Sequence, residues 1–347
     1  MTLRSDTLAT VTGWCFFIGA VLPALAAPQT DAAHPPNIVP STGVRALAAS
    51  STAHSNRVCL AARPFYWEVG DRQSVQASGS EGAGSPNPST EMPISTSSEW
   101  VFAAYVAQAR GDKLTPVDIR ALTMHSGYTN LQADRCRQLT PGAPKRPLTV
   151  SGCFHAAHLV GGTNGDYHGK QADHFYFDGG HYQWLAAGDP ALKDLDATGL
   201  TSAIGNALKT GGSLTYESPL LDAGIRTTPM SYAGFLRRIL SGELGIHDLL
   251  GAHAVCTNPS RCAQAASTPL PQTESPHYSL GSWVEDDPHS GDDAFSDPGL
   301  LGFYPWIDSS KTWYGVLARV SHVAGGYVGS MQCGRLIRKA WVSGKVQ

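Results

Sequence analysis

The sequence predicts a mixed α/β (α+β) protein in which one sheet is assembled from strands at both ends of the chain. Two short candidate strands meet at a turn early in the chain, and three more lie in its last quarter. Between them, apolar residues recur with the 3.6-residue period of helices. Because the strands must find partners, we expect the two ends to share a sheet and the middle to pack as a helical lobe.

The early strands are "RPFYWEVGD" and "SVQASGS", which flank a Gly-Asp turn and so predict a hairpin. The late strands are predicted in "HYSLGSWVED", "GLLGFYPWID" and "TWYGVLARV". A closing helix is predicted in "GSMQCGRLIRKAWVSG".

The longest helical pattern of the middle region begins at Ser97. Apolar residues at i, i+3, i+4 and i+7 from Trp100 share one face, and Gly111 ends the segment. Just before it, "MPISTSSE" crowds four hydroxyls and a carboxylate together at the helix start.

A second helix is predicted immediately afterwards. Thr115 is its N-cap, Pro116 occupies the first helical position, and Gly127 ends it. Two further helices are expected near 192–208 and 230–242.

The first residues have the features of a secretory signal. Arg4 gives a basic start, an apolar stretch runs from Val11 to Leu25, and small residues end it, so we predict a signal peptide at 1–26. A membrane anchor is disfavoured, because Thr, Gly and Pro interrupt the stretch and no later segment approaches about 20 continuous apolar residues. We expect an exported protein, periplasmic or secreted, without a membrane span after signal removal.

Residues 27–57 are rich in Pro, Ala, Ser and Thr and show no apolar period. This composition is typical of a flexible linker. The folded domain is therefore predicted to span 58–347.

The cysteines agree with export. Cys15 belongs to the signal, which leaves an even number. Short loop closure favours Cys136–Cys153 and Cys256–Cys262, and elimination leaves Cys59–Cys333, although six cysteines permit other pairings. A zinc site is disfavoured, because no C-x2-C pair occurs.

Charge excludes one class of partner. The net charge is −3, charged residues make up 15% of the chain, and no basic block occurs. A nucleic-acid partner is therefore not expected. We also expect no cofactor.

The order of segments resembles that of a known superfamily. A hairpin, a Ser/Thr cluster opening a long helix, "LTMHSGYTNL", "FYFDGGHYQWLA", "SYAGFLRRILSGEL" and a late G-x-x-G-x-x-x-W-I-D follow one another. This order is similar to the serine β-lactamase, penicillin-binding protein and esterase superfamily, nearest its class C-like branch. The resemblance spans roughly 58–341 and implies an antiparallel sheet flanked by helices.

The resemblance also implies an activity. In that superfamily a Ser in an S-x-x-K motif attacks an acyl group, the Lys and the Tyr of Y-x-N move protons, and H-T-G borders the oxyanion hole. It implies an ester or amide substrate here, either a small molecule or a cell-envelope polymer.

The first motif is altered. Alignment places Thr96 at the nucleophile and Glu99 at the lysine, with Ser97 beside the substrate. Thr needs a nearby base, and a carboxylate with an ordinary pKa of about 4.3 is a weak one. Ser95 and Ser98 are alternative nucleophiles, and the whole cluster is also what an ordinary helix cap requires.

The second motif is altered as well. An ungapped alignment places Phe177 at the tyrosine, and a shift of one residue offers Tyr176 with Asp178 instead. We take Tyr176 and Asp178 as candidates, together with His181, whose ordinary pKa suits proton transfer. The alternatives are a core aromatic residue for Tyr176 and a hydrogen-bonded packing residue for His181.

In place of H-T-G the chain has Asp297-Pro298-Gly299. Gly299 would let an edge strand approach the substrate closely. Asp297 would place a negative charge there and, with Glu99, repel anionic substrates.

Three functions follow from these residues. The favoured one is an exported hydrolase that forms an acyl-enzyme at the start of the Trp100 helix. The alternative is a catalytically silent relative that acts as a binding module in the cell envelope. A metal site that includes His155 and His158 is disfavoured, because no H-E-x-x-H occurs.

Overall fold

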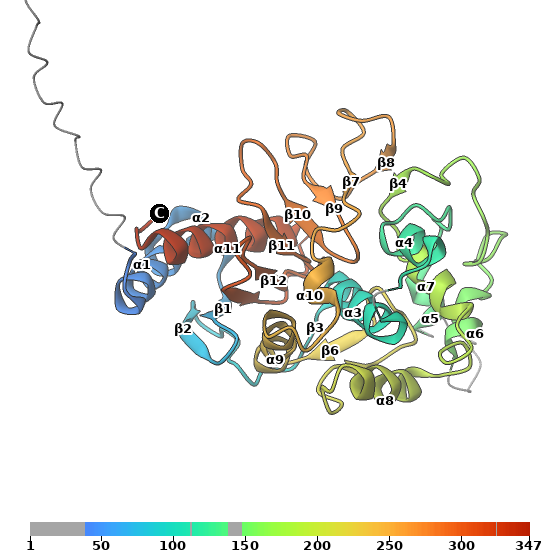
Figure 1. Cartoon of the computed structure of the whole chain (residues 1–347), viewed down its shortest axis with the longest axis horizontal. Helices are drawn as coiled ribbons and strands as arrows, with labels where there is room; N and C mark the ends of the chain where they lie inside the picture. The colour runs from blue at the N-terminus through green and yellow to red at the C-terminus, as the bar shows by residue number, and fades with distance from the viewer. Residues whose placement is uncertain (1–38, 112, 138–147, 324) are drawn as a thin grey trace, which may run out of the picture. The chain divides into compact units, whose positions relative to one another are not determined.

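An antiparallel sheet runs through the molecule, with helices on both of its faces (Figure 1). The computed structural model of the chain describes residues 39–111, 113–137, 148–323 and 325–347. The predicted signal at 1–26 lies outside these residues.

The large sheet joins the two ends of the chain, as predicted. From one edge to the other its strands are β2 Val75–Glu81, β1 Phe65–Gly70, β13 Tyr314–Ala318, β12 Tyr304–Ile307, β11 Ala294–Ser296, β10 Trp283–Glu285, β9 His277–Tyr278 and β7 Val255–Cys256. The early hairpin pairs with the last strand of the chain through β1 and β13, where Glu68 lies opposite Val316.

Two small sheets lie in the helical lobe. One contains β3 Met92–Pro93, β6 Ile225–Thr227 and β5 Thr215–Tyr216, and the other pairs β4 Phe175–Tyr176 with β8 Ala265–Ser267.

The described helices fall into two groups. Those beside the chain ends are α1 Thr42–Ser55, α2 Arg57–Ala62 and α11 Gly326–Ser343. Those of the middle region are α3 Ser98–Arg110, α4 Pro116–Leu122, α5 Ala133–Cys136, α6 Val150–Phe154, α7 Gly180–Ala187, α8 Ala197–Ala207, α9 Pro229–Leu240 and α10 Ile246–Leu249. The capping box of α4 confirms the predicted start at Thr115 and Pro116.

The pleat of the sheet explains why helices cover both faces. On β12, Tyr304 and Trp306 face α11, where the guanidinium carbon of Arg338 lies 5.3 Å from the Trp306 ring centroid. On the other face, Tyr314 accepts a hydrogen bond from Arg237 of α9. Side chains on both faces of the central strands are buried, including the polar Glu68, Glu285 and Ser296.

The predicted Trp100 helix, α3, is the centre of the helical lobe. Every residue from Ser98 to Ala107 is buried. The β9–β10 turn approaches α3 so closely that a Cβ on Gly281 would lie 2.4 Å from the Ala103 Cβ. A helix surrounded in this way draws its stability from packing rather than from propensity.

The predicted flexible linker at 27–57 is wrong for the residues that the structure describes. Residues 42–55 form α1, capped by Ser41, and pack against α11. Arg45 donates hydrogen bonds to the Trp341 and Val342 carbonyls, at 2.8 and 2.7 Å. The buried face of α1 consists of small residues, Ala48, Ala49, Thr52 and Ala53. These residues differ little in hydrophobicity from those on the exposed face of α1, so the helical period is weak in the sequence.

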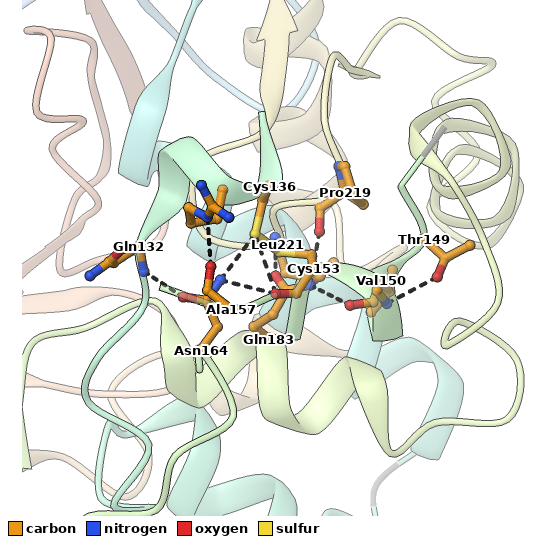
Figure 2. Close-up of a disulfide and its surroundings, with 12 residues drawn as sticks. Gln132, Cys136, Thr149, Val150, Cys153, Ala157, Asn164, Gln183, Pro219 and Leu221 are labelled. Atoms are coloured by element: carbon orange, nitrogen blue, oxygen red, sulfur yellow. Dashed lines mark hydrogen bonds between the residues drawn. A yellow bond between two sulfur atoms is a disulfide. The ribbon is translucent and has the colours of Figure 1, made fainter. Parts of the chain in front are cut away.

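All three predicted disulfides are present. Cys59–Cys333 joins α2 to α11, Cys136–Cys153 joins α5 to α6, and Cys256–Cys262 closes a short loop. Figure 2 shows the second bond, with the buried Asn164 beside it donating to the Cys153 carbonyl at 2.9 Å. Among the described residues, no helix is long and apolar enough to cross a bilayer.

Deleting residues 28–56 should lower the melting temperature by several degrees, because it exposes the α11 surface that α1 covers. Differential scanning calorimetry of the two proteins gives the difference. An Arg45→Ala variant should fall between them, since it loses only the Arg45 hydrogen bonds and the contact of its guanidinium with the Trp313 ring. An unchanged melting temperature in the deletion would mean that α1 contributes nothing.

The Cys59–Cys333 and Cys256–Cys262 disulfides should differ in their contribution to stability. Cys59–Cys333 spans 274 residues and Cys256–Cys262 only 6. Chain entropy then predicts losses of about 6 and about 2 kcal/mol when each pair is replaced by serines. Urea unfolding measures both free energies, and equal losses would exclude loop closure as the source.

Candidate functional site

The Ser/Thr cluster lies where the short sheet and the central helix meet. The Ile94 N–H donates to the Ile225 carbonyl, and Ser95–Ser97 form a single 3₁₀ turn that leads into α3. Ser97 is the N-cap by position, yet its side chain makes no capping hydrogen bond. The cluster is therefore not the ordinary helix cap that its composition suggests.

The cap of α3 comes from elsewhere in the chain. One carboxyl oxygen of Asp297 accepts a hydrogen bond from the Trp100 N–H at 3.0 Å. Asp297 immediately follows β11, so the large sheet supplies the acceptor for the first turn of the central helix. The sequence gives no local signal for a cap from a residue this distant.

Thr96 lies at the cluster but is already engaged. Its hydroxyl donates to the Pro298 carbonyl at 3.1 Å and accepts from the Leu300 N–H at 3.2 Å. The residue is 4% exposed. Its proton therefore points to a carbonyl oxygen, which is not a base.

The three neighbouring serines differ in their hydrogen-bond partners. Ser97 donates to the Asp297 carbonyl at 2.6 Å, and Ser98 donates to the Ser95 carbonyl at 2.7 Å. In the described part of the chain, the Ser95 hydroxyl has no hydrogen-bond partner, and its φ of 51° lies in the left-handed region.

Gly299 allows this close packing. A Cβ on Gly299 would lie 2.0 Å from the Ile94 carbonyl oxygen and 3.0 Å from the Ser97 hydroxyl. The residue lies between β11 and β12, not on an edge strand, and β11 pairs with β10 on its other side. Gly299 thus brings the chain against the Ser/Thr cluster itself, whereas we had expected it to approach a substrate.

Glu99 is completely buried in the first turn of α3. One of its carboxyl oxygens accepts from the Tyr278 hydroxyl at 2.7 Å, and the other has no partner among the described residues. Burial raises the pKa of Glu99 well above its ordinary value, and the nearby Asp297 and Asp222 raise it further. This raised pKa disfavours the carboxylate form that the expected role of Glu99 as a base requires.

The pKa of Asp297 is shifted in the same direction. Burial raises it well above the ordinary value, and the Trp100 hydrogen bond offsets this only in part. The second carboxyl oxygen of Asp297 has no partner in the described residues. The raised pKa disfavours the negative charge that we expected to repel anionic substrates.

Two more buried acids extend the cluster. Burial raises the pKa of Asp222 to about 6 and that of Asp178 to about 7. Asp178 accepts hydrogen bonds from the N–H groups of Leu131 and Gly180, at 3.1 and 2.8 Å, and so holds the start of α7. Asp222 was not identified from the sequence, because no motif surrounds it.

The remaining predicted residues lie in the β4–α7 segment. Tyr176 is half-buried, and its carbonyl oxygen is 2.9 Å from His181 Nε2. The Ser126 N–H donates to His181 Nδ1, which assigns the ring proton to Nε2. Burial lowers the pKa of His181 to about 3, so the imidazole stays neutral. Its contacts are those of a packing residue.

Tyrosines from other elements reach Glu99 instead. The hydroxyls of Tyr278 on β9 and Tyr182 on α7 are 2.8 Å apart, and Tyr278 donates to Glu99. The ring of Phe177 lies against Tyr278, with centroids 6.2 Å apart. Burial raises the pKa of both phenols well above the ordinary value. Tyr278 was predicted only as part of a strand, and nothing local marks its contact with Glu99.

The histidines of the metal hypothesis do not converge. Helix α6 ends at Phe154, before His155, and His158 Nε2 is 2.9 Å from the Asn164 side-chain oxygen. Within the described ranges, no group of three or more His, Cys, Asp or Glu could hold a metal ion.

The fold is shared with several solved structures. A Bacteroides dorei protein described as a β-lactamase is 18% identical, with a TM-score of 0.53 over 81% of this chain and 93% of its own. A D-stereospecific amidohydrolase from Streptomyces sp. is 13% identical, with a TM-score of 0.52 over 84% and 98%. EstCE1, a hydrolase with promiscuous acyltransferase activity, is 13% identical, with a TM-score of 0.53 over 87% and 98%.

These likenesses define the class of the fold. The chain has the fold of the serine β-lactamase, penicillin-binding protein and esterase superfamily, as its order of segments indicated. No family model and no curated protein matches the chain.

The buried acids should make stability depend on pH. A raised folded-state pKa means that the folded chain binds protons more tightly, so the contribution of Glu99 is complete below its unfolded pKa of about 4.3. That contribution is lost as pH rises toward the folded-state pKa. Glu99→Gln should therefore flatten the fall in unfolding free energy above about pH 4, by up to about 1.4 kcal/mol per pH unit.

Urea unfolding at several pH values measures this slope. Replacing the exposed Asp194 by Asn is the matched control and should leave the slope unchanged. A slope in Glu99→Gln equal to that of the unaltered chain would show that Glu99 is ionised in the folded protein.

Proposed function

We propose that the protein is a catalytically silent relative of the serine hydrolases with this fold and acts as an exported binding module. The observation that carries the proposal is the Thr96 hydroxyl, which is hydrogen-bonded to both Pro298 and Leu300 and almost fully buried. A nucleophile needs a base that accepts its proton and a path for the substrate.

Neither requirement is met around Thr96. The hydroxyl proton is directed at the Pro298 carbonyl, and Glu99 is a buried acid that is bonded to Tyr278 and has a raised pKa. A substrate would have to displace the Pro298–Leu300 segment and break both Thr96 hydrogen bonds. Each such bond contributes about 1 kcal/mol.

Export is part of the proposal. Three disulfides fit an oxidising compartment such as the periplasm or the exterior of the cell. The apolar start of the chain would provide the signal. The ligand is then a component of that environment.

One observation favours a second function, hydrolysis of an ester or amide through an acyl-enzyme. The Ser95 hydroxyl is free of partners in the described part of the chain, and its left-handed backbone is the kind of strain found at functional sites. Ser95 is one residue from the aligned position. In this alternative the ester or amide is a small molecule or a cell-envelope polymer.

Labelling with a fluorophosphonate, followed by peptide mass spectrometry, distinguishes the two functions. We expect no labelled residue and no hydrolysis of p-nitrophenyl acetate above background, with an active serine esterase as the positive control. Thr96→Val, which keeps the shape, should lower the unfolding free energy by about 1–3 kcal/mol because it leaves buried groups unpaired. Neither Thr96→Val nor Ser95→Ala should change the background rate.

If the fluorophosphonate labels Ser95 or Thr96, and the corresponding variant is not labelled, the proposal that the protein is catalytically silent is overturned. The hydrolytic alternative would then hold, with the labelled residue as its nucleophile.

A further inference from the structure

A cavity of about 370 Å³ lies beside α9, apart from the Ser/Thr cluster. Segments that are distant in the sequence line it. They are Arg72 from the β1–β2 turn, three residues after α8 (Lys209, Thr210 and Ser213), residues 231–238 of α9, and Glu243 just beyond that helix. By volume it has room for roughly a dozen water molecules, which is more than a single small ion fills.

Positive charge dominates the lining. Four cations, Arg72, Lys209, Arg237 and Arg238, face one carboxylate, Glu243. Glu243 already forms an ion pair with Arg238. A local excess of this kind is notable in a chain whose net charge is −3. It attracts anions and repels metal ions.

Arg237 is held in place from the sheet side. It donates to the Tyr314 hydroxyl at 2.8 Å, and its guanidinium carbon lies 5.6 Å from the centroid of that ring. Tyr314 in turn donates to Glu68 at 2.8 Å. Burial raises the pKa of Glu68, which weakens its ability to neutralise Arg237. The arginine is thus fixed, with N–H groups remaining for a ligand.

The other two cations are available. Arg72 and Lys209 are exposed, and their side chains form no ion pair or hydrogen bond within the described residues. Both come from turns, so their positions can adjust to a ligand while Arg237 and Arg238 stay fixed by their partners.

Hydroxyl groups complete the lining. Ser231 accepts from the Thr228 hydroxyl at 3.0 Å, so its own proton remains available as a donor. The Thr210 hydroxyl oxygen is shielded from solvent and has no partner among the described residues. Guanidinium groups together with hydroxyl donors are the combination that recognises phosphate and sulfate oxygens.

We infer that this cavity, defined by Arg72, Lys209, Arg237 and Arg238, binds a small molecule through a phosphate or sulfate group. The anionic group would lie among the four cations, and the Ser231 hydroxyl would donate to one of its oxygens. The inference rests on the binding role proposed above and gives it a ligand class. The cavity is separate from Thr96, so the two can fail independently.

Isothermal titration calorimetry of the full exported protein tests the inference, with glucose 6-phosphate, glucose, inorganic phosphate and inorganic sulfate as probes. Glucose 6-phosphate, inorganic phosphate and sulfate should all bind, because each presents anionic oxygens to the four cations, and added salt should weaken their binding. Glucose should not bind. Binding of glucose as tight as that of glucose 6-phosphate would overturn the anion assignment. No heat from any probe at millimolar concentration would overturn the site.

A pair of variants with equal charge change gives the control. Arg72→Ala with Lys209→Ala should weaken glucose 6-phosphate at least about tenfold, since two charged contacts are lost. Lys170→Ala with Lys193→Ala removes two exposed cations elsewhere and should leave the affinity unchanged. An equal loss of affinity in both double variants would overturn the site, because binding would then depend only on the net charge of the protein.

The outcome is distinguishable from that of the fluorophosphonate experiment. Labelling of Ser95 or Thr96 would end the silent assignment without affecting the cavity. Failure of the sugar phosphate to bind would remove the ligand class and leave the closed Thr96 site as it is.

Discussion

The hydrogen bond from the Trp100 N–H to Asp297 joins the two halves of this molecule. Asp297 follows a strand of the large sheet, and Trp100 is in the first turn of the buried central helix. The carboxyl group accepts a hydrogen bond from an N–H that has no partner within the helix, as a local cap would. Because the helix start is buried, leaving that N–H unpaired would be expensive. This hydrogen bond therefore fixes the position of α3 relative to the large sheet.

Placing an acid at this point has consequences for the whole cluster. The chain around Asp297 must lie directly on the Ser/Thr turn, which only Gly299 permits, and this contact engages the Thr96 hydroxyl. Burial raises the pKa of Asp297 and Glu99, because a charged carboxylate in a dry interior is costly. The silent function proposed above rests on this packing around Thr96. A shared fold does not by itself imply a shared activity.

A binding role agrees with where polar groups remain unsatisfied. At the Ser/Thr cluster most hydroxyls are paired with the protein's own backbone. Beside α9, by contrast, the side chains of Arg72 and Lys209 are exposed and have no partner in the described part of the chain. Exposed and unpaired charges are suited to a ligand, whereas paired and buried groups serve the fold.

Local pattern by itself determined much of this protein. Alternating apolar residues and turn residues indicated the hairpin, the late strands and the closing helix, and the cysteine spacing indicated the disulfides. The α1 helix was missed because its buried face is alanine, which gives little hydrophobic contrast. The sequence also predicted that Thr96, Glu99 and Asp297 belong to one site. Only the tertiary structure decided how buried these side chains are and which groups they bond. The pKa, the exposure and the hydrogen-bond partners of a side chain depend on groups that are distant in the chain, such as Tyr278 and Pro298. The spacing of residues along the sequence does not show which side chains become buried.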